Sequence, residues 1–227
     1  MKLDNKTFDE MEKKYGSLMP WPASSERRRT FFETLIITVL SQNTSDNNTI
    51  KAFSRLEKVM DVTPENLANA DIKVIKEAIK PGGLYNIKAE RIKNIARIIL
   101  EKFDGELDFV LKYPLDVARE KLLEIPGVGK KTADVVLTRV HTYKKIIPID
   151  THMNRIAKRL GLVDDKAGYE DIQKALIDFF PDDLRERGSA LLWLLAKYTC
   201  KAQRPRCEEC SLRNICKFYD RDAVLNN

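Results

Sequence analysis

Apolar residues recur along most of this chain at the three- and four-residue spacing that places them on one face of an α-helix. Residues 30–40 differ, because their apolar positions lie all round the helix, as in a helix buried in the middle of a domain. No stretch alternates convincingly between apolar and polar residues as a half-buried strand does. Further helices are predicted at residues 72–79, 88–103, 115–125, 130–140, 152–162, 169–180 and 189–199. The fold is therefore predicted to be all-α.

Two helix starts can be predicted from capping residues. Ser25 is expected to cap the helix that runs through residues 30–40. Thr63 followed by Pro64 predicts a second start, because proline at the first helical position gives up no hydrogen bond. No solenoid repeat and no low-complexity linker interrupts the chain, so we expect compact helical packing.

Composition narrows the class of protein. The 227 residues are 43% hydrophobic and 33% charged, which is typical of a soluble globular protein. No apolar run approaches the roughly 18 residues of a membrane span. Residues 1–16 mix acidic and basic side chains without an apolar stretch, so we expect neither a signal nor a transit peptide. The protein is predicted to be cytoplasmic.

Charge suggests a polyanionic partner. Forty basic residues against 34 acidic ones leave a net charge of +6. Between residues 197 and 217 the basic residues Lys197, Lys201, Arg204, Arg206, Arg213 and Lys217 outnumber two glutamates. A solvated surface would also explain such a cluster, so charge alone does not decide the function.

The segment LLEIPGVGKKTADVVL at residues 122–137 predicts two amphipathic helices joined by a tight turn. Glycines in the turn allow positive φ and remove side chains that would keep a ligand from the backbone. Bare N–H groups at the start of the second helix would then bind a phosphate oxygen. The predicted contacts are Gly127, Val128, Gly129, Lys130 and Thr132. Tight packing of the two helices is the alternative explanation.

Lys131 and Asp150 are the candidate catalytic residues. Lys131 lies in the first turn of the predicted second helix, next to Lys130. The positive end of the helix and the like charge of Lys130 both disfavour the Lys131 cation, which predicts a lowered pKa and a nucleophilic amine. Asp150 follows an apolar run and precedes a helix, so it could cap that helix or supply a carboxylate that accepts a proton or stabilises positive charge.

Taken together, these motifs resemble the endonuclease III family, bifunctional DNA glycosylases of the helix-hairpin-helix superfamily. The resemblance rests on LLEIPGVGKKTADVVL followed by IDTH, on GLYNIKAERI upstream, and on Cys-x6-Cys-x2-Cys-x5-Cys near the end. It spans roughly residues 25 to 217. It implies a six-helix barrel domain with the hairpin at residues 23–140, and an iron–sulfur cluster domain formed by residues 1–22 and 141–227.

All four cysteines, Cys200, Cys207, Cys210 and Cys216, lie within a single short segment. Only one Cys-x2-Cys pair is present, whereas a four-cysteine zinc site usually has two pairs separated by a longer span. The resemblance therefore implies a [4Fe-4S] cluster, with zinc as the alternative and disulfides disfavoured in the cytoplasm. Such a cluster would hold the fold together and display Lys201, Arg204 and Arg206 towards DNA.

The resemblance also implies an activity. The enzyme would flip an oxidised pyrimidine out of double-stranded DNA, and Lys131 would attack C1′ to form a Schiff base, after which β-elimination nicks the abasic site. Lys131 and Asp150 would meet at a cleft between the domains. A monomer associated with the nucleoid is expected.

Two loops depart from the family pattern. Asn43 stands where the pattern has a glutamine that fills the gap left by the flipped base, and neighbouring Gln42 could take that role instead. Leu84 stands where an apolar wedge enters the base stack, but Pro81, Gly82 and Gly83 change the preceding loop. Both stretches could also be plain helix ends and turns.

Two other functions stay open at this point. A monofunctional glycosylase for uracil, thymine or adenine mismatches would belong to the same superfamily, but related members lack an amine at position 131. A non-catalytic DNA-binding or electron-transfer module would use only the hairpin and the cluster, and it would leave Lys131 and Asp150 without a role.

Overall fold

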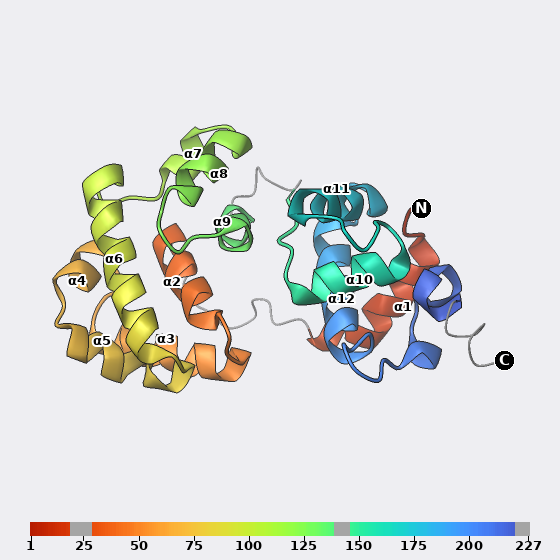
Figure 1. Cartoon of the computed structure of the whole chain (residues 1–227), viewed down its shortest axis with the longest axis horizontal. Helices are drawn as coiled ribbons and strands as arrows, with labels where there is room; N and C mark the ends of the chain where they lie inside the picture. The colour runs from red at the N-terminus through yellow and green to blue at the C-terminus, as the bar shows by residue number, and fades with distance from the viewer. Residues whose placement is uncertain (19–28, 139–145, 221–227) are drawn as a thin grey trace. The chain divides into compact units, whose positions relative to one another are not determined.

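A computed structural model describes residues 1–18, 29–138 and 146–220, and every regular element in these ranges is a helix (Figure 1). The chain divides into two compact units. Residues 26–143 form what we call the central unit, and residues 1–25 together with 144–227 form the terminal unit. The predicted domain limits at 22/23 and 140/141 lie outside the described residues.

Eight α-helices are described in the central unit, together with the 3₁₀ turn η2 (Lys80–Gly82). They are α2 (Phe31–Ser41), α3 (Asp46–Val59), α4 (Pro64–Asn69), α5 (Ile72–Ile79), α6 (Tyr85–Phe103), α7 (Phe109–Lys112), α8 (Leu115–Leu123) and α9 (Lys130–Leu137).

Helix α2 lies in the middle of the central unit, where it packs against α3, α6 and α9 (Figure 1). Its residues Leu35, Ile36, Val39 and Leu40 are completely buried. Each such side chain contributes about 1.5–3 kcal/mol of burial free energy. The prediction of a buried helix at residues 30–40 is confirmed.

The start of α2 differs from the sequence prediction. Thr30, and not Ser25, caps the helix: its Oγ1 accepts a hydrogen bond from the Glu33 N–H at 3.1 Å, and the Glu33 carboxylate accepts one from the Thr30 N–H at 2.8 Å. This reciprocal capping box satisfies two N–H groups that no helical carbonyl reaches. Ser25 itself lies outside the described residues.

Four α-helices are described in the terminal unit, together with the 3₁₀ turns η1 (Gly16–Leu18), η3 (Cys207–Glu209) and η4 (Arg213–Ile215). They are α1 (Asn5–Tyr15), α10 (Thr151–Leu160), α11 (Tyr169–Phe179) and α12 (Arg185–Tyr198). Helix α10 packs against α11 and α12, and one apolar core joins the three with α1.

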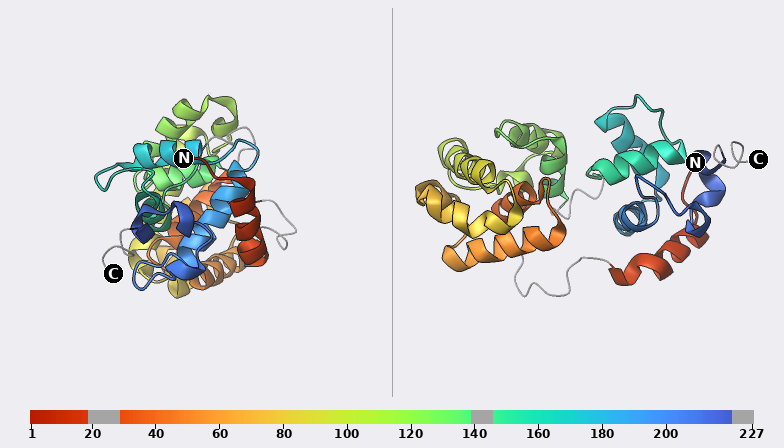
Figure 2. Two further views of the ribbon diagram at one scale, coloured as in Figure 1. Left: turned by 90° about the vertical axis from the view of Figure 1, so that its right-hand side faces the viewer. Right: turned by 60° about the horizontal axis from the view of Figure 1, so that its bottom comes forward.

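The two ends of the described chain come together in the terminal unit. Helix α1 packs along α12, and Figure 2 shows the red α1 beside the blue C-terminal segment. Lys14 Nζ donates to the Glu209 carbonyl at 2.6 Å, and the hydroxyls of Tyr15 and Thr199 are 2.6 Å apart. The N-terminal helix therefore supports the segment that contains the cysteines. No helix in the described ranges is both long and apolar enough to cross a bilayer.

Candidate functional site

The predicted hairpin is formed by α8 and α9 and the turn between them. Gly127 has φ of +89°, and a Cβ there would lie 3.0 Å from Arg91 Cδ, so the turn requires glycine at this position. Gly129 is different: its φ of −93° is extended backbone, and the prediction of positive φ is wrong for it. A Cβ at Gly129 would meet nothing within 4 Å, so the backbone here is open to a ligand.

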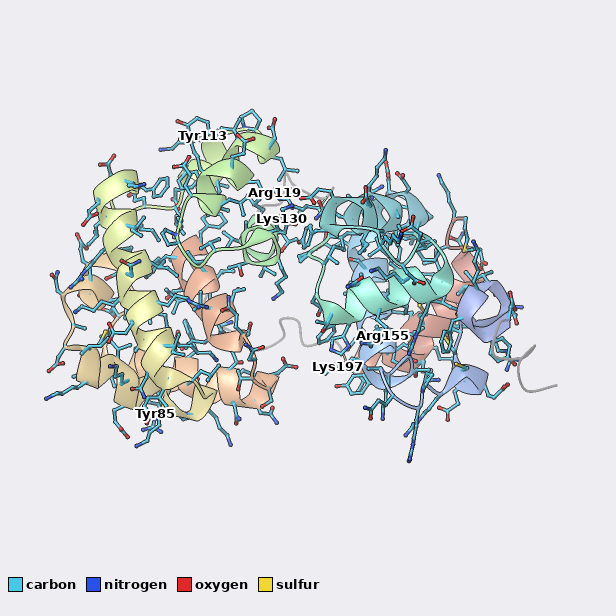
Figure 3. The ribbon with its side chains drawn as sticks, viewed as in Figure 1. Tyr85, Tyr113, Arg119, Lys130, Arg155 and Lys197 are labelled. Carbon is cyan, nitrogen blue, oxygen red and sulfur yellow. The ribbon has the colours of Figure 1, made fainter. Side chains whose placement is uncertain are left out.

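Helix α9 begins at Lys130, as the sequence predicts, and no side chain caps it. Val128 and Thr132 are buried, so only their backbone groups are available to a partner. Lys130, labelled in Figure 3, is exposed, and Lys131 is half-buried one residue further into the helix. The positive end of the helix dipole and an exposed ammonium thus lie at the same turn.

An ion pair fixes the two hairpin helices to each other. Arg119 on α8 donates to both carboxylate oxygens of Asp134 on α9, at 2.7 and 3.1 Å. Asp134 is fully buried, so this two-point contact compensates a charge that would otherwise be very costly. Arg119 is labelled near Lys130 in Figure 3. The pair holds the turn between the helices in one geometry.

Asp150 caps helix α10 of the terminal unit. Its Oδ1 accepts hydrogen bonds from the backbone N–H groups of His152 at 2.9 Å and Met153 at 2.8 Å. Its Oδ2 accepts one from Trp193 Nε1 on α12 at 2.7 Å. Both oxygens act as acceptors, an arrangement that suits a carboxylate. The capping that the sequence suggests is confirmed, and the catalytic role stays a prediction.

Trp193 is a contributor to this site that sequence reasoning missed. Its only signal was a place in an apolar helix, SALLWLLAKYT, where tryptophan reads as a packing residue. Lys197, labelled on α12 in Figure 3, holds its Nζ 4.6 Å from the Trp193 ring centroid. The His152 ring packs edge-on against the same indole. The indole is therefore fixed on several sides and fixes Asp150 in turn.

The two loops predicted to contact bases share an unusual backbone conformation. Asn43 has φ of +54° and Leu84 has φ of +48°, a left-handed region that asparagine tolerates and leucine rarely enters. Leu84 immediately precedes α6, and its side chain is 54% exposed. Asn43 is also exposed, while Gln42 beside it is half-buried. Both residues are exposed at the surface of the central unit, and the backbone strain is confined to Leu84.

The four cysteines surround one pocket in the terminal unit. Cys200 follows α12, Cys207 begins η3 and Cys210 directly follows it, and η4 precedes Cys216. Phe218 and Tyr219 also line the pocket. Among the described residues, no three His, Cys, Asp or Glu side chains converge closely enough to hold a single metal ion. Thiolates arranged around a space, with aromatic cover, fit an iron–sulfur cube.

Arginines from α10 support the cysteine segment. Arg159 Nη1 donates to the Lys201 carbonyl at 2.7 Å and lies 3.3 Å from Cys200 Sγ. Arg155, labelled in Figure 3, donates to the Cys200 carbonyl at 2.9 Å and to the Ala196 carbonyl at 2.6 Å. These donors satisfy the carbonyls where α12 ends and orient the first cysteine.

Burial raises the pKa of the Cys210 thiol to about 11, and the other three cysteines act in the same direction. Cysteine binds iron as the thiolate, so binding of iron would release protons. It would also stabilise the ionised thiolates, which burial in the protein alone disfavours. Cys210 would be a cluster ligand together with Cys200, Cys207 and Cys216. When bound, the cluster would link these four positions to one another and so stabilise the segment.

The basic residues predicted to face DNA lie in and beside the same segment. Lys201, Arg204 and Arg206 are all exposed. Arg204 has φ of +48°, and Arg206 also approaches Glu209 Oε2 at 3.9 Å. Exposed cations between the first two cysteines are thus presented to solvent by a loop that the cysteines enclose.

Comparison with known proteins decides the family. The profile described as HhH-GPD superfamily base excision DNA repair protein matches residues 36–182. The profile described as iron–sulfur binding domain of endonuclease III matches residues 200–216. Endonuclease III of Thermotoga maritima is 42% identical over 190 residues, which cover 84% of each chain.

The chain belongs to the endonuclease III family.

Further relatives agree with this. Endonuclease III of Escherichia coli K12 is 33% identical over 202 residues, covering 89% of this chain and 90% of that one. A solved structure of a trapped endonuclease III–DNA covalent intermediate, an estranged-adenine complex, is similar with a TM-score of 0.76 at 30% identity, covering 96% of each chain.

Membership of the endonuclease III family confirms several predictions. The all-α helix-hairpin-helix glycosylase fold is confirmed, as are a base excision repair enzyme with glycosylase and AP lyase activity and a [4Fe-4S] cluster. The similar DNA complexes support DNA binding.

Proposed function

We propose that this endonuclease III family member acts as a monomer, removes oxidised pyrimidines from double-stranded DNA and nicks the resulting abasic site by β-elimination through Lys131. The observation that supports this most directly is the place of Lys131: it lies in the first turn of α9, directly after an open hairpin turn. The central unit would supply the hairpin and the nucleophile, and the terminal unit the cluster and the carboxylate.

The hairpin turn would bind the DNA backbone. Gly129 leaves its backbone open, no side chain caps α9, and exposed Lys130 adds a positive charge at the same place. Backbone N–H groups at a helix N-terminus bind a phosphate oxygen without reading base sequence. Such a contact would position the neighbouring Lys131 relative to the sugar of a flipped nucleotide.

The chemical step assigned to Lys131 balances as follows. Its neutral amine forms a bond to C1′ while the N-glycosidic bond breaks, and the base leaves with its electron pair and takes up a proton. The sugar ring then opens to give a protonated Schiff base. Loss of a proton from C2′ expels the 3′ phosphate, and water finally releases the sugar aldehyde and restores the amine. The lowered pKa argued from the sequence for Lys131 stays a prediction.

Asp150 would stabilise positive charge that develops on the sugar or accept the proton from the attacking amine. Three hydrogen bonds hold its two oxygens in place, so its position costs no reorganisation at the moment of reaction. The [4Fe-4S] cluster takes no part in this step. Two of its cysteine ligands, Cys200 and Cys207, stand at the ends of the loop that would present Lys201 and Arg204 to phosphates.

The substrate assignment is tested by single-turnover assays on end-labelled duplexes. One duplex carries thymine glycol, a second a G·T mismatch, a third uracil opposite guanine. We expect strand cleavage without alkali on the thymine glycol duplex and much slower reaction on the other two. Products that appear only after alkali treatment, and mainly from the mismatched duplexes, would instead identify a monofunctional mismatch glycosylase. No product from any duplex would contradict the proposal altogether.

A further inference from the structure

A buried lysine on α6 joins two turns of the central unit for which DNA contacts are predicted. Lys88 is only 3% exposed, and its Nζ donates to the Leu40 carbonyl at 2.7 Å and to the Gly82 carbonyl at 2.8 Å. Leu40 lies in the last turn of α2, where free carbonyls and the negative end of the helix dipole favour a cation. Gly82 belongs to the turn that leads to Leu84.

The geometry of Lys88 is costly to maintain. Burial lowers the pKa of Lys88, and the nearby positive charge of Arg91 lowers it further. A methionine of similar length would be buried at smaller cost, so the amine is explained by the two carbonyls that it bonds. The ends of α2 and η2 are thereby held at a fixed spacing.

Arg91, one turn further along α6, joins the same loop to the hairpin. Its Nη1 donates to Gln42 Oε1 at 2.6 Å. Its stem lies against Gly127, where a Cβ would be 3.0 Å from Cδ and 3.2 Å from Cγ. Arg91 therefore contacts both the residue before Asn43 and the turn that would bind a phosphate. Figure 3 labels Tyr85 at the start of this helix.

The side-chain amides of Gln42 and Asn43 lie in different environments. Gln42 is half-buried, with its side-chain oxygen bound to a guanidinium. Asn43 is exposed in the left-handed conformation, and its side chain makes no hydrogen bond to another residue in the described part of the chain. An unengaged carboxamide with both a donor and an acceptor suits the edge of an unpaired base.

We propose that Arg91 is a positioning residue. It holds Gln42 away from DNA, so that Asn43, which stands where the family pattern has its gap-filling glutamine, occupies the gap alone. Through this contact Arg91 sets the preference for the opposite base. This inference rests on the proposed function, because it assumes that the enzyme extrudes a base. It also chooses between the two residues that the sequence offered for the gap-filling role. Gln42 is assigned to the protein and Asn43 to the substrate.

The preference for the base opposite the lesion depends on which of these two amides reaches it. Asn is one methylene shorter than Gln, so it reaches less far towards the orphaned base and its hydrogen bonds depend on where the loop is held. Loss of the Arg91 guanidinium releases Gln42, whose longer amide then competes for the same space. The ratio of rates for different opposite bases should therefore change when Arg91 is replaced.

The test compares single-turnover excision of one lesion opposite each of the four bases, together with affinity for a duplex containing a stable abasic-site analogue. The variants are Asn43→Ala, Gln42→Ala, Arg91→Leu and the double variant of Gln42→Ala with Arg91→Leu. Arg97→Leu, an exposed arginine on the same helix, is the matched control. Leucine keeps much of the stem that packs on Gly127 while removing the guanidinium.

We expect Asn43→Ala to weaken affinity for the abasic analogue about tenfold, the size of one good hydrogen-bonded contact. Gln42→Ala should change affinity less than about threefold. Arg91→Leu should change the ratio of rates between opposite bases about fivefold or more, and adding Gln42→Ala should largely restore the ratio. Arg97→Leu should leave the ratio unchanged.

Two results would overturn the inference. One is a larger effect of Gln42→Ala than of Asn43→Ala, which would make Gln42 the gap-filling residue. The other is an unchanged opposite-base ratio in Arg91→Leu. Should Arg91→Leu fail to fold, Arg91→Lys, which cannot reproduce the planar fork, replaces it. The parent enzyme must cleave abasic duplex throughout; if it does not, the proposed function fails rather than the role of Arg91.

Discussion

Asp150 caps a helix and is also the carboxylate proposed to act in catalysis. Its Oδ1 caps α10 through two backbone N–H groups, and its Oδ2 accepts the indole N–H of Trp193. The indole contact holds the oxygen that the cap does not use. Replacing Trp193 removes this contact but keeps the carboxylate, so it tests the two roles separately.

Replacing Asp150 with asparagine keeps an oxygen for the cap but presents an amide N–H₂ that cannot accept from Trp193. We expect the AP lyase rate to fall about a hundredfold, the contribution usual for a positioned acid or base. Trp193→Phe is the control, because it retains the carboxylate, and we expect it to lose less than about tenfold. Strand-nicking kinetics on abasic duplex measure both. Equal losses would reduce Asp150 to a structural residue.

Gly127 and Gly129 offer a matched pair of substitutions. Gly127→Ala places a Cβ in the left-handed region and against Arg91, so we expect about 1–2 kcal/mol of destabilisation. Gly129 has an extended backbone with open space beside it, so Gly129→Ala should hardly change the stability. The added methyl group would, however, obstruct the open backbone, and we expect weaker binding to damaged and undamaged DNA alike. Thermal unfolding and DNA titration distinguish the two effects. Unchanged affinity in Gly129→Ala would argue against a phosphate contact at this turn.

Single residues differ in how far the sequence reveals them. The cap by Asp150 and the glycine at 127 were predictable, because capping and tight turns are local. Trp193 and Lys88 were not predictable, because their partners lie 43 and 48 residues away in the chain. A lysine in an amphipathic helix looks like a surface residue until the carbonyls that surround it are known.

At the scale of helices, α6 holds in place the turns of the central unit for which DNA contacts are predicted. Lys88→Met should leave the Leu40 and Gly82 carbonyls buried without their donor, and we expect a loss of about 2–5 kcal/mol in the free energy of unfolding. Lys102→Met, exposed in the last turn of the same helix, should cost less than about 0.5 kcal/mol. Denaturation followed by circular dichroism compares them. A Lys88→Met protein as stable as the parent would show that the carbonyls find other partners.

The helices themselves were largely predictable from apolar spacing, with three exceptions. The helices that were not predicted are α1 (Asn5–Tyr15), α3 (Asp46–Val59) and the single turn α7 (Phe109–Lys112). In α3 only Thr49, Ala52, Phe53 and Leu56 are buried, a narrow stripe in a mainly polar segment whose start resembles a loop. In α1 only Met11 and Tyr15 are buried, and docking on α12 rather than internal pattern stabilises the helix.

At the scale of the whole molecule, we expect the [4Fe-4S] cluster to support both the fold of the cysteine segment and DNA binding. Cys210→Ser should abolish the visible absorption of the cluster and lower DNA affinity about tenfold or more, because the loop with Lys201 and Arg204 loses its fixed ends. Ser211→Ala at the adjacent position is the control and should retain iron. Iron content and DNA titration are the measurements. Full iron content in Cys210→Ser would remove Cys210 from the ligand set.

The central claim is that Lys131 forms the covalent bond to the sugar. Borohydride trapping on duplexes with thymine glycol or an abasic site tests it directly, using the parent protein, Lys131→Ala and, as the matched control, Lys130→Ala. We predict a covalent adduct on both duplexes with the parent and with Lys130→Ala, and none with Lys131→Ala. An adduct that persists in Lys131→Ala, or no adduct with the parent, would contradict the assignment.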